Sequence, residues 1–210
     1  EQVCPAGAVD FEQEPERIVE LEVGAIIVTA GYTLLDPGVV KEYGHGRYPN
    51  VLSSIEFERM MNASGPTGGH ILRPSDSRPP RNIAFIQCVG SRDLRRGVPY
   101  CSAVCCMYSM KEAILVKEHI PDCETEIFHM DVRAFGKGFE EYYNRAEEVY
   151  KIRYTRSRVA EIAENPETRS LVLRFVDEEG EFKEKEFDMV VRGRAARGRE
   201  GTERGPGHRA

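Results

Sequence analysis

The chain has 210 residues, of which 40% are hydrophobic and 30% are charged, the composition of an ordinary globular protein with a buried core. No apolar run approaches the roughly 20 residues that a membrane-spanning helix needs, and the first residues lack the basic and apolar regions of a signal peptide. The net charge of −6 argues against nucleic acid as the main partner, because phosphate binding depends on Lys and Arg. We therefore expect a cytoplasmic protein, and the absence of an initiator Met predicts that the chain is a fragment.

The first 15 residues contain one cysteine, Cys4, which Pro5 follows directly. A Cys-Pro pair before a small-residue turn is typical of the end of a bacterial ferredoxin repeat. The other cysteines of such a repeat are missing, so a free thiol remains an equally good interpretation of Cys4.

The next 65 residues contain two predicted elements. Glu22–Tyr32 is a β-branched run that predicts a buried strand, and Gly31 at its end would let a ligand approach the backbone. Ser54–Asn62 is expected to form a short helix capped by Ser53 or Ser54. Arg73–Pro80 has the composition of an extended linker.

From Arg81 onwards, strand and helix patterns alternate. The expected strands are Asn82–Gln87, Glu126–Val132 and one that starts at Ile152; the expected helices are Cys101–Ile120 and Gly138–Tyr150; and Leu171–Val176 with Phe182–Val191 is expected to form a hairpin. Strands that flank a helix of this length indicate a βαβ unit. The chain is therefore predicted to be α/β, with a doubly wound Rossmann-like sheet and a β appendage.

Four of the six cysteines lie within 19 residues and follow the spacing C-x₁₂-C-x₃-C-C: Cys88, Cys101, Cys105 and Cys106. In a parallel α/β sheet, ligands bind at the carboxyl ends of the strands, which is where Cys88 is expected. Cys101 and Cys105 would share one face of the following helix, whose N-terminus favours negative charge. This arrangement favours an iron–sulfur cluster.

Three other interpretations of these cysteines stay open. Structural zinc usually takes two C-x₂₋₄-C pairs, which the adjacent Cys105 and Cys106 fit poorly. A redox-active dithiol would need a C-x-x-C motif, and small apolar cysteines also pack in ordinary cores. If zinc were the metal, the chain would be a non-catalytic Rossmann-like interaction module.

At these residues the sequence resembles the A subunit of heterodisulfide reductase. The matching stretches are Ile86-Gln87-Cys88-Val89-Gly90-Ser91-Arg92-Asp93, Tyr100-Cys101-Ser102-Ala103-Val104-Cys105-Cys106-Met107-Tyr108-Ser109-Met110-Lys111 and Met130-Asp131-Val132-Arg133-Ala134-Phe135-Gly136-Lys137-Gly138-Phe139-Glu140. The resemblance runs from Cys4 to about Val191. It implies a truncated thioredoxin-reductase-like fold that binds FAD.

The resemblance also implies a role for individual residues. It makes Cys88, Cys101, Cys105 and Cys106 the ligands of a [4Fe–4S] cluster and Cys4 the last ligand of a ferredoxin-like insert. Lys111 would lie near the flavin ring, where a cation stabilises reduced flavin, and Gly31 and Tyr32 would form a turn on the flavin side. An ordinary solvated helix lysine is the alternative interpretation of Lys111.

For the whole protein, the resemblance implies an oxidoreductase that passes electrons from a hydrogenase or formate dehydrogenase module to partner subunits that reduce a disulfide. In some members the FAD divides electron pairs by bifurcation. Three departures from the family pattern stand out. Its N-terminal Gly-rich FAD loop is absent, the strand end reads Thr29-Ala30-Gly31 where relatives usually have Ala-Thr-Gly, and the residues from Arg192 onwards are rich in Arg and Gly.

These observations predict four segments. Residues 1–15 would end a ferredoxin-like insert, 16–80 would be part of an FAD-binding domain and a linker, 81–191 would be the Rossmann-like domain with the cysteines, and 192–210 would be a disordered or artefactual tail.

Overall fold

The computed structural model describes residues 4–27, 29, 31–95, 98–194 and 196–198. The chain divides into two compact units, Glu1–Ala30 and Gly31–Ala210.

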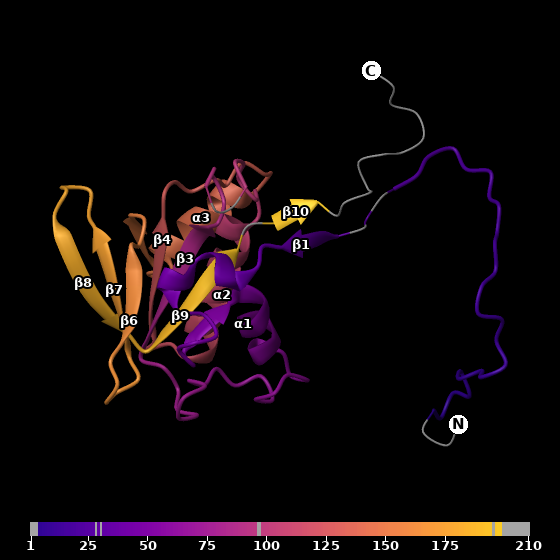
Figure 1. Ribbon diagram of the computed structural model, residues 1–210, viewed down its shortest axis with the longest axis horizontal. Helices are drawn as coiled ribbons and strands as arrows, with labels where there is room; N and C mark the ends of the chain where they lie inside the picture. Colours follow the sequence, from indigo (N-terminus) through magenta and orange to yellow (C-terminus); the bar gives the residue numbers. More distant parts are fainter. Residues whose placement is uncertain (1–3, 28, 30, 96–97, 195, 199–210) are drawn as a thin grey trace. The chain divides into compact units, whose positions relative to one another are not determined.

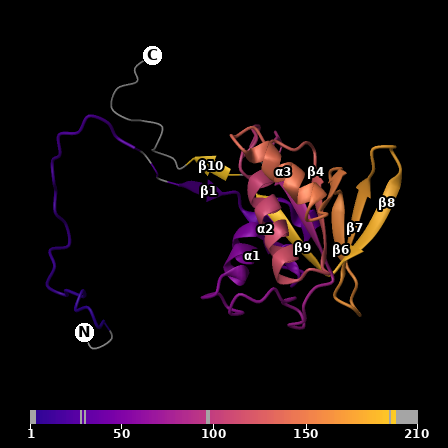
Figure 2. The same cartoon turned by 180° about the vertical axis from the view of Figure 1, so that it is seen from behind.

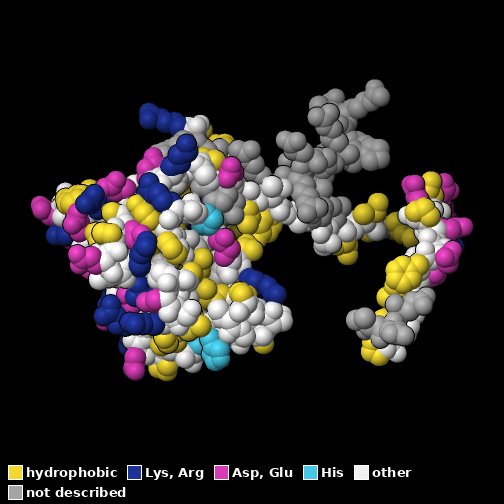
Figure 3. Space-filling view, turned by 60° about the horizontal axis from the view of Figure 1, so that its bottom comes forward, with side chains coloured by type: hydrophobic (Ala, Val, Ile, Leu, Met, Phe, Trp, Pro, Cys, Tyr) yellow, Lys and Arg dark blue, Asp and Glu magenta, His cyan; other side chains and the backbone are white. Residues whose placement is uncertain are grey.

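The described part of the first unit, residues 4–27 and 29, contains no helix or strand. The strand predicted over Glu22–Tyr32 is therefore wrong for these residues: Ile26 is 80% exposed and Ile27 is 88% exposed. A buried strand must hydrogen bond to neighbouring strands, and the described residues of this unit supply none. Both its apolar and its acidic side chains are exposed (Figure 3).

The second unit is built on a parallel sheet of five strands (Figure 1). In spatial order these are β2 (Val51–Ser53), β9 (Met189–Arg194), β3 (Asn82–Val89), β4 (Glu124–His129) and β5 (Arg153–Arg156). All four neighbouring pairs are parallel, so the carboxyl ends of the strands share one edge.

Three helices cover one face of this sheet (Figures 1 and 2). They are α1 (Ser54–Met61), α2 (Cys105–His119) and α3 (Phe139–Glu148). The predicted cap of α1 is confirmed, because Ser53 and Glu56 form a reciprocal capping box. The core between helices and sheet includes Phe57, Phe85 and Met110, each fully buried.

An antiparallel sheet of three strands covers the opposite face. It consists of β6 (Glu161–Glu164), β7 (Leu171–Val176) and β8 (Phe182–Phe187). Phe128 of β4 joins the two layers, since its ring packs edge-to-face on Phe175 at 5.0 Å and on Phe187 at 5.9 Å between centroids. The predicted α/β fold, a Rossmann-like parallel sheet with a β appendage, is confirmed.

The hairpin prediction is correct for β7 and β8 but wrong beyond Phe187. The predicted second strand, Phe182–Val191, breaks at Asp188, after which β9 enters the parallel sheet. Asp188 is buried and accepts three hydrogen bonds from Arg81, one from the backbone N–H at 2.8 Å and two from the guanidinium at 3.1 Å. These bonds anchor the chain beside the start of β3, which redirects it from one sheet to the other.

Replacing Asp188 with asparagine is expected to destabilise the protein by about 2 kcal/mol at neutral pH, since hydrogen bonds to a charged group contribute about 1.5–3 kcal/mol each. Burial opposes ionisation of Asp188, but the bonds from Arg81 outweigh it and hold the pKa below its usual value. A depressed pKa stabilises the fold above the unfolded-state pKa of about 3.9, and this contribution disappears as the pH falls through the lower folded-state value. Urea unfolding of wild type and Asp188→Asn should therefore show a gap at pH 7 that narrows below about pH 4; a constant gap would contradict this explanation.

The end of the described chain is part of the fold. Arg192 is 1% exposed within β9, so the sheet continues past the predicted boundary at residue 191. Ala196–Gly198 form β10, which pairs antiparallel with β1 (Tyr32–Leu34). The rest of the predicted tail, residues 195 and 199–210, lies outside the described residues.

Two short 3₁₀ turns, η1 (Pro37–Val39) and η2 (Lys41–Tyr43), connect β1 to β2. Tyr43 of η2 donates a hydrogen bond to the Val159 carbonyl at 2.7 Å. Among the described residues, no helix has the length and apolar character needed to cross a membrane.

Candidate functional site

Three of the four clustered cysteines meet at the carboxyl edge of the parallel sheet. Cys88 lies near the end of β3, and Cys105 and Cys106 are the first two residues of α2. Cys101 lies in the loop before α2, so the predicted helical start at Cys101 is wrong by four residues. The cause is local: Ala103 has a left-handed backbone, with φ of 59°, which an α-helix does not accept.

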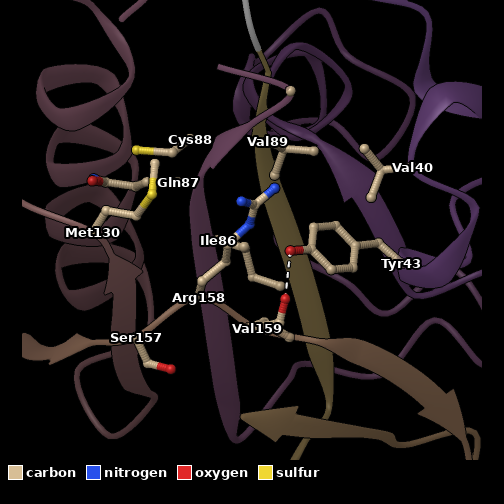
Figure 4. Close-up of a pocket in the computed structure, with 11 residues that line it drawn as sticks. Val40, Tyr43, Ile86, Gln87, Cys88, Val89, Met130, Ser157, Arg158 and Val159 are labelled. Carbon is tan, nitrogen blue, oxygen red and sulfur yellow. Dashed lines mark hydrogen bonds between the residues drawn. The ribbon is translucent and has the colours of Figure 1, made fainter. Parts of the chain in front are cut away.

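The backbone also changes direction at Cys88. Its φ is 60°, and the register between β3 and β9 shifts between Ile86 and Val89. Such a bulge redirects side chains that would otherwise alternate across the sheet. As a result, Cys88 and Gln87 point to the same side of β3, as Figure 4 shows.

Interactions with the neighbouring Cys106 and Cys88 side chains hold the pKa of Cys105 far below its ordinary value. The interaction with Cys105, followed by burial, raises the pKa values of Cys88 and Cys106. A lowered pKa favours the thiolate form of Cys105. Its position at the N-terminus of α2 favours that negative charge as well.

Backbone N–H groups point at two of the sulfurs. The Ala103 N–H donates to Cys101 Sγ at 3.3 Å, and the Arg133 N–H donates to Cys106 Sγ at 3.4 Å. Four thiols with such donors form the ligand chemistry that an iron–sulfur cluster takes. Within the described part of the chain, no three His, Cys, Asp or Glu side chains stand in the arrangement that holds a single metal ion.

Two ion pairs that share Asp131 border this edge of the sheet. Arg92 donates to Asp131 Oδ1 at 2.7 Å, and Arg133 approaches Asp131 Oδ2 at 3.4 Å. The thiols therefore lie beside two guanidinium groups that share the single negative charge of Asp131.

Cys4 lies in the other unit, Glu1–Ala30, and is described with that unit alone. Its pKa is lowered by backbone N–H groups, that of Ala8 first and that of Ala6 next.

The residues predicted to contact flavin gather near α1 and α2. Lys111 forms an ion pair with Glu58 at 2.7 Å. Tyr32 lines a cavity of about 160 Å³, together with Glu58 and Glu112. Gly31, the residue before Tyr32, has φ of 72° and space around its Cα.

Sequence reasoning did not identify Glu112. This side chain is 1% exposed, burial followed by the nearby Glu58 raises its pKa well above the usual value, and Oε2 has no hydrogen-bond partner among the described residues. The signal was present, because Glu112 shares the buried face of α2 with Cys105, Ser109 and Val116. A carboxyl group on such a face is rare without a function or a partner.

Two more residues of the site do not follow from the sequence. Gly193 of β9 approaches Cys105 so closely that a Cβ there would lie 3.4 Å from Cys105 Cβ and 3.1 Å from Tyr108 Oη. Gln87 Oε1 lies 3.3 Å from Cys106 Sγ. Sequence spacing predicts neither contact, since both join segments that are far apart along the chain.

Comparison with known proteins gives strong similarity to one set of relatives. The chain is 58% identical over 187 residues to the second iron–sulfur A subunit of the CoB–CoM heterodisulfide reductase of Methanopyrus kandleri, covering 89% of this chain and 28% of that protein. It is 54% identical over 194 residues to the A subunit of the H₂:CoB-CoM heterodisulfide,ferredoxin reductase of Methanothermobacter marburgensis, covering 92% and 29%. The A subunit of the H₂/formate:CoB-CoM heterodisulfide,ferredoxin reductase of Methanococcus maripaludis is 48% identical over 187 residues, covering 89% and 28%.

No protein-family model matches the chain. Among solved structures, 2-naphthoyl-CoA reductase aligns with a TM-score of 0.47 and 15% identity, over 79% of this chain and 19% of that one. The FAD-bound cadaverine monooxygenase of Erwinia amylovora aligns with a TM-score of 0.49 and 6% identity, over 82% and 44%. These scores are too low to add to the topology described above.

Proposed function

The chain is a segment of a protein of the heterodisulfide reductase A-subunit family, and from this premise we propose that it binds a [4Fe–4S] cluster through Cys88, Cys101, Cys105 and Cys106. The chain spans about 28% of the length of the relatives it matches. The single observation that supports the proposal most is that the fold brings Cys88, near the carboxyl end of β3, beside Cys105 and Cys106, the first two residues of α2.

The cluster would supply one-electron transfer, and the chain's own residues would hold it and adjust its charge. The backbone N–H groups of Ala103 and Arg133 already point at two sulfurs. Donors of this kind stabilise negative charge on cluster ligands and so affect the reduction potential. Cys4 would belong to a separate ferredoxin-like cluster, as the resemblance implies.

We further propose that FAD binds near Lys111, Gly31 and Tyr32. Support comes from the position of Tyr32 on a cavity shared with Glu58, the ion-pair partner of Lys111. At about 160 Å³ the cavity is smaller than the roughly 300–1,000 Å³ usual for cofactor sites. The described residues would therefore contact one edge of the flavin, and other parts of the protein would hold the remainder.

For the whole protein we propose an oxidoreductase role within a cytoplasmic complex. Electrons would pass from a hydrogenase or formate dehydrogenase module, through FAD and clusters, to partner subunits that reduce a disulfide. The names of the relatives support this proposal, since they combine H₂, formate and ferredoxin with the CoB–CoM heterodisulfide. Division of electron pairs at the FAD belongs to the same proposal.

Iron and acid-labile sulfide analysis of the anaerobically isolated protein tests the cluster, together with EPR of the reduced sample. We expect about four irons and four sulfides per cluster and a broad absorbance in the visible range. Stoichiometric zinc without this absorbance would instead support the interaction module with a structural zinc site. A folded protein that contains neither metal would contradict both functions.

A further inference from the structure

Gln87 places an amide on a buried, otherwise apolar face of β3. Its side chain is 5% exposed and follows Ile83 and Phe85, which belong to the core beneath the helices. Burying an amide without full hydrogen bonding costs free energy. Nε2 of Gln87 has no hydrogen-bond partner among the described residues, so packing alone does not explain this side chain.

A hydrogen bond of this amide leads to the cysteines. Cys106 Sγ donates to Gln87 Oε1 at 3.3 Å, and Figure 4 shows the amide extending beside Cys88. This bond requires a protonated sulfur. A sulfur that is bound to iron carries no proton and can only accept, so the present arrangement would leave two acceptors facing each other.

A half-turn of the terminal amide removes this conflict. The O and N atoms of a glutamine amide occupy nearly equivalent positions, so the turn places Nε2–H where Oε1 now lies, within reach of Cys106 Sγ. The donor that now has no partner among the described residues would then have one. The oxygen takes the other position, and a carbonyl with an unused lone pair is tolerated better than a buried N–H.

We propose that Gln87 is a positioning residue whose amide donates a hydrogen bond to the Cys106 sulfur when this sulfur ligates the cluster, and that it thereby favours the reduced cluster. The inference rests on the proposed [4Fe–4S] site. Reduction adds one negative charge to the cluster, and a charge-assisted hydrogen bond strengthens as the acceptor becomes more negative. The amide would act on the same sulfur as the Arg133 N–H, from a different segment of the chain.

The test compares the full chain, isolated anaerobically with its iron, with Gln87→Leu and Gln87→Met. Both variants keep an apolar stem of similar volume but lack the N–H donor. Ile86→Val is the matched control, because Ile86 is the neighbouring buried residue and packs in the core on the other face of β3. The readout is the ratio of reduced to oxidised cluster in an EPR-monitored redox titration.

At a given solution potential, we expect the ratio of reduced to oxidised cluster to fall about tenfold in both Gln87 variants. A change of this size is typical when one hydrogen bond to a charged group is lost. Ile86→Val should leave it unchanged. Wild-type protein without iron would refute the proposed cluster itself. Iron in all variants with equal ratios would refute only the role of Gln87.

Loss of iron provides a second criterion if the Gln87 variants bind the cluster poorly. Iron lost from both Gln87 variants but kept in Ile86→Val would support the amide as a group that holds the cluster. Equal loss from all three variants would show that the packing of β3 is responsible, and would overturn the inference.

Discussion

Replacing Cys105 with serine is expected to reduce the iron content from about four atoms per cluster to below about one, because thiolates are the ligands that iron–sulfur clusters take. Cys105 lies beside Cys106 and Cys88, and it is almost fully buried at the first turn of α2. Serine keeps the size but removes the thiolate. The expected loss appears as reduced iron, sulfide and visible absorbance.

Cys123→Ser is the matched control for this experiment. Cys123 is also buried, but it lies beyond the other end of α2, where its thiol hydrogen bonds weakly to the Glu124 carbonyl at 3.7 Å. Burial raises its pKa to about 12, so it is an ordinary core thiol. This variant should keep its iron. Equal iron in wild type and Cys105→Ser would contradict the proposed ligand set.

Phe128→Ala is expected to destabilise the second unit by about 3–5 kcal/mol, the usual range when a buried phenylalanine is truncated. Phe128 is 1% exposed and joins the parallel sheet to β6–β8 through its edge-to-face contacts with Phe175 and Phe187. Its removal leaves a cavity between two layers of regular structure, which cannot easily collapse around it. Urea unfolding followed by circular dichroism measures the change.

Phe182→Ala controls for the loss of an aromatic side chain from the same part of the fold. Phe182 begins β8 and is 62% exposed, and exposed substitutions usually change stability by less than about 0.5 kcal/mol. If Phe128→Ala lost much less unfolding free energy than about 3–5 kcal/mol, and about as little as the control variant, the contact between the two sheets would not depend on this ring.

The sequence by itself determined the order of the main elements and the approximate location of the candidate site. The β3–α2–β4 unit followed from the alternation of a short apolar run, a helical repeat and a second apolar run, because these patterns arise within one element. The position of Cys88 near the carboxyl end of a strand followed in the same way. Local patterns also predicted the serine cap that starts α1.

Only the tertiary structure decided where side chains from distant segments meet. The strand pattern is continuous through Asp188, but the strand ends there because Asp188 accepts hydrogen bonds from Arg81. Arg81 is 107 positions away along the chain, so the local pattern does not reveal this contact. The left-handed backbone at Cys88 and Ala103 determines which way their neighbours point, and no apolar repeat encodes such a turn.

The buried polar groups follow the same rule. Gln87 and Glu112 occur in segments that are otherwise mostly apolar, and the role of each side chain depends on which groups face it across the core. Ile26 and Ile27 are the opposite case, because their segment has an apolar strand pattern and yet both side chains are exposed. A strand pattern in the sequence indicates which backbone conformation is favoured, but a strand forms only where other strands satisfy its hydrogen bonds.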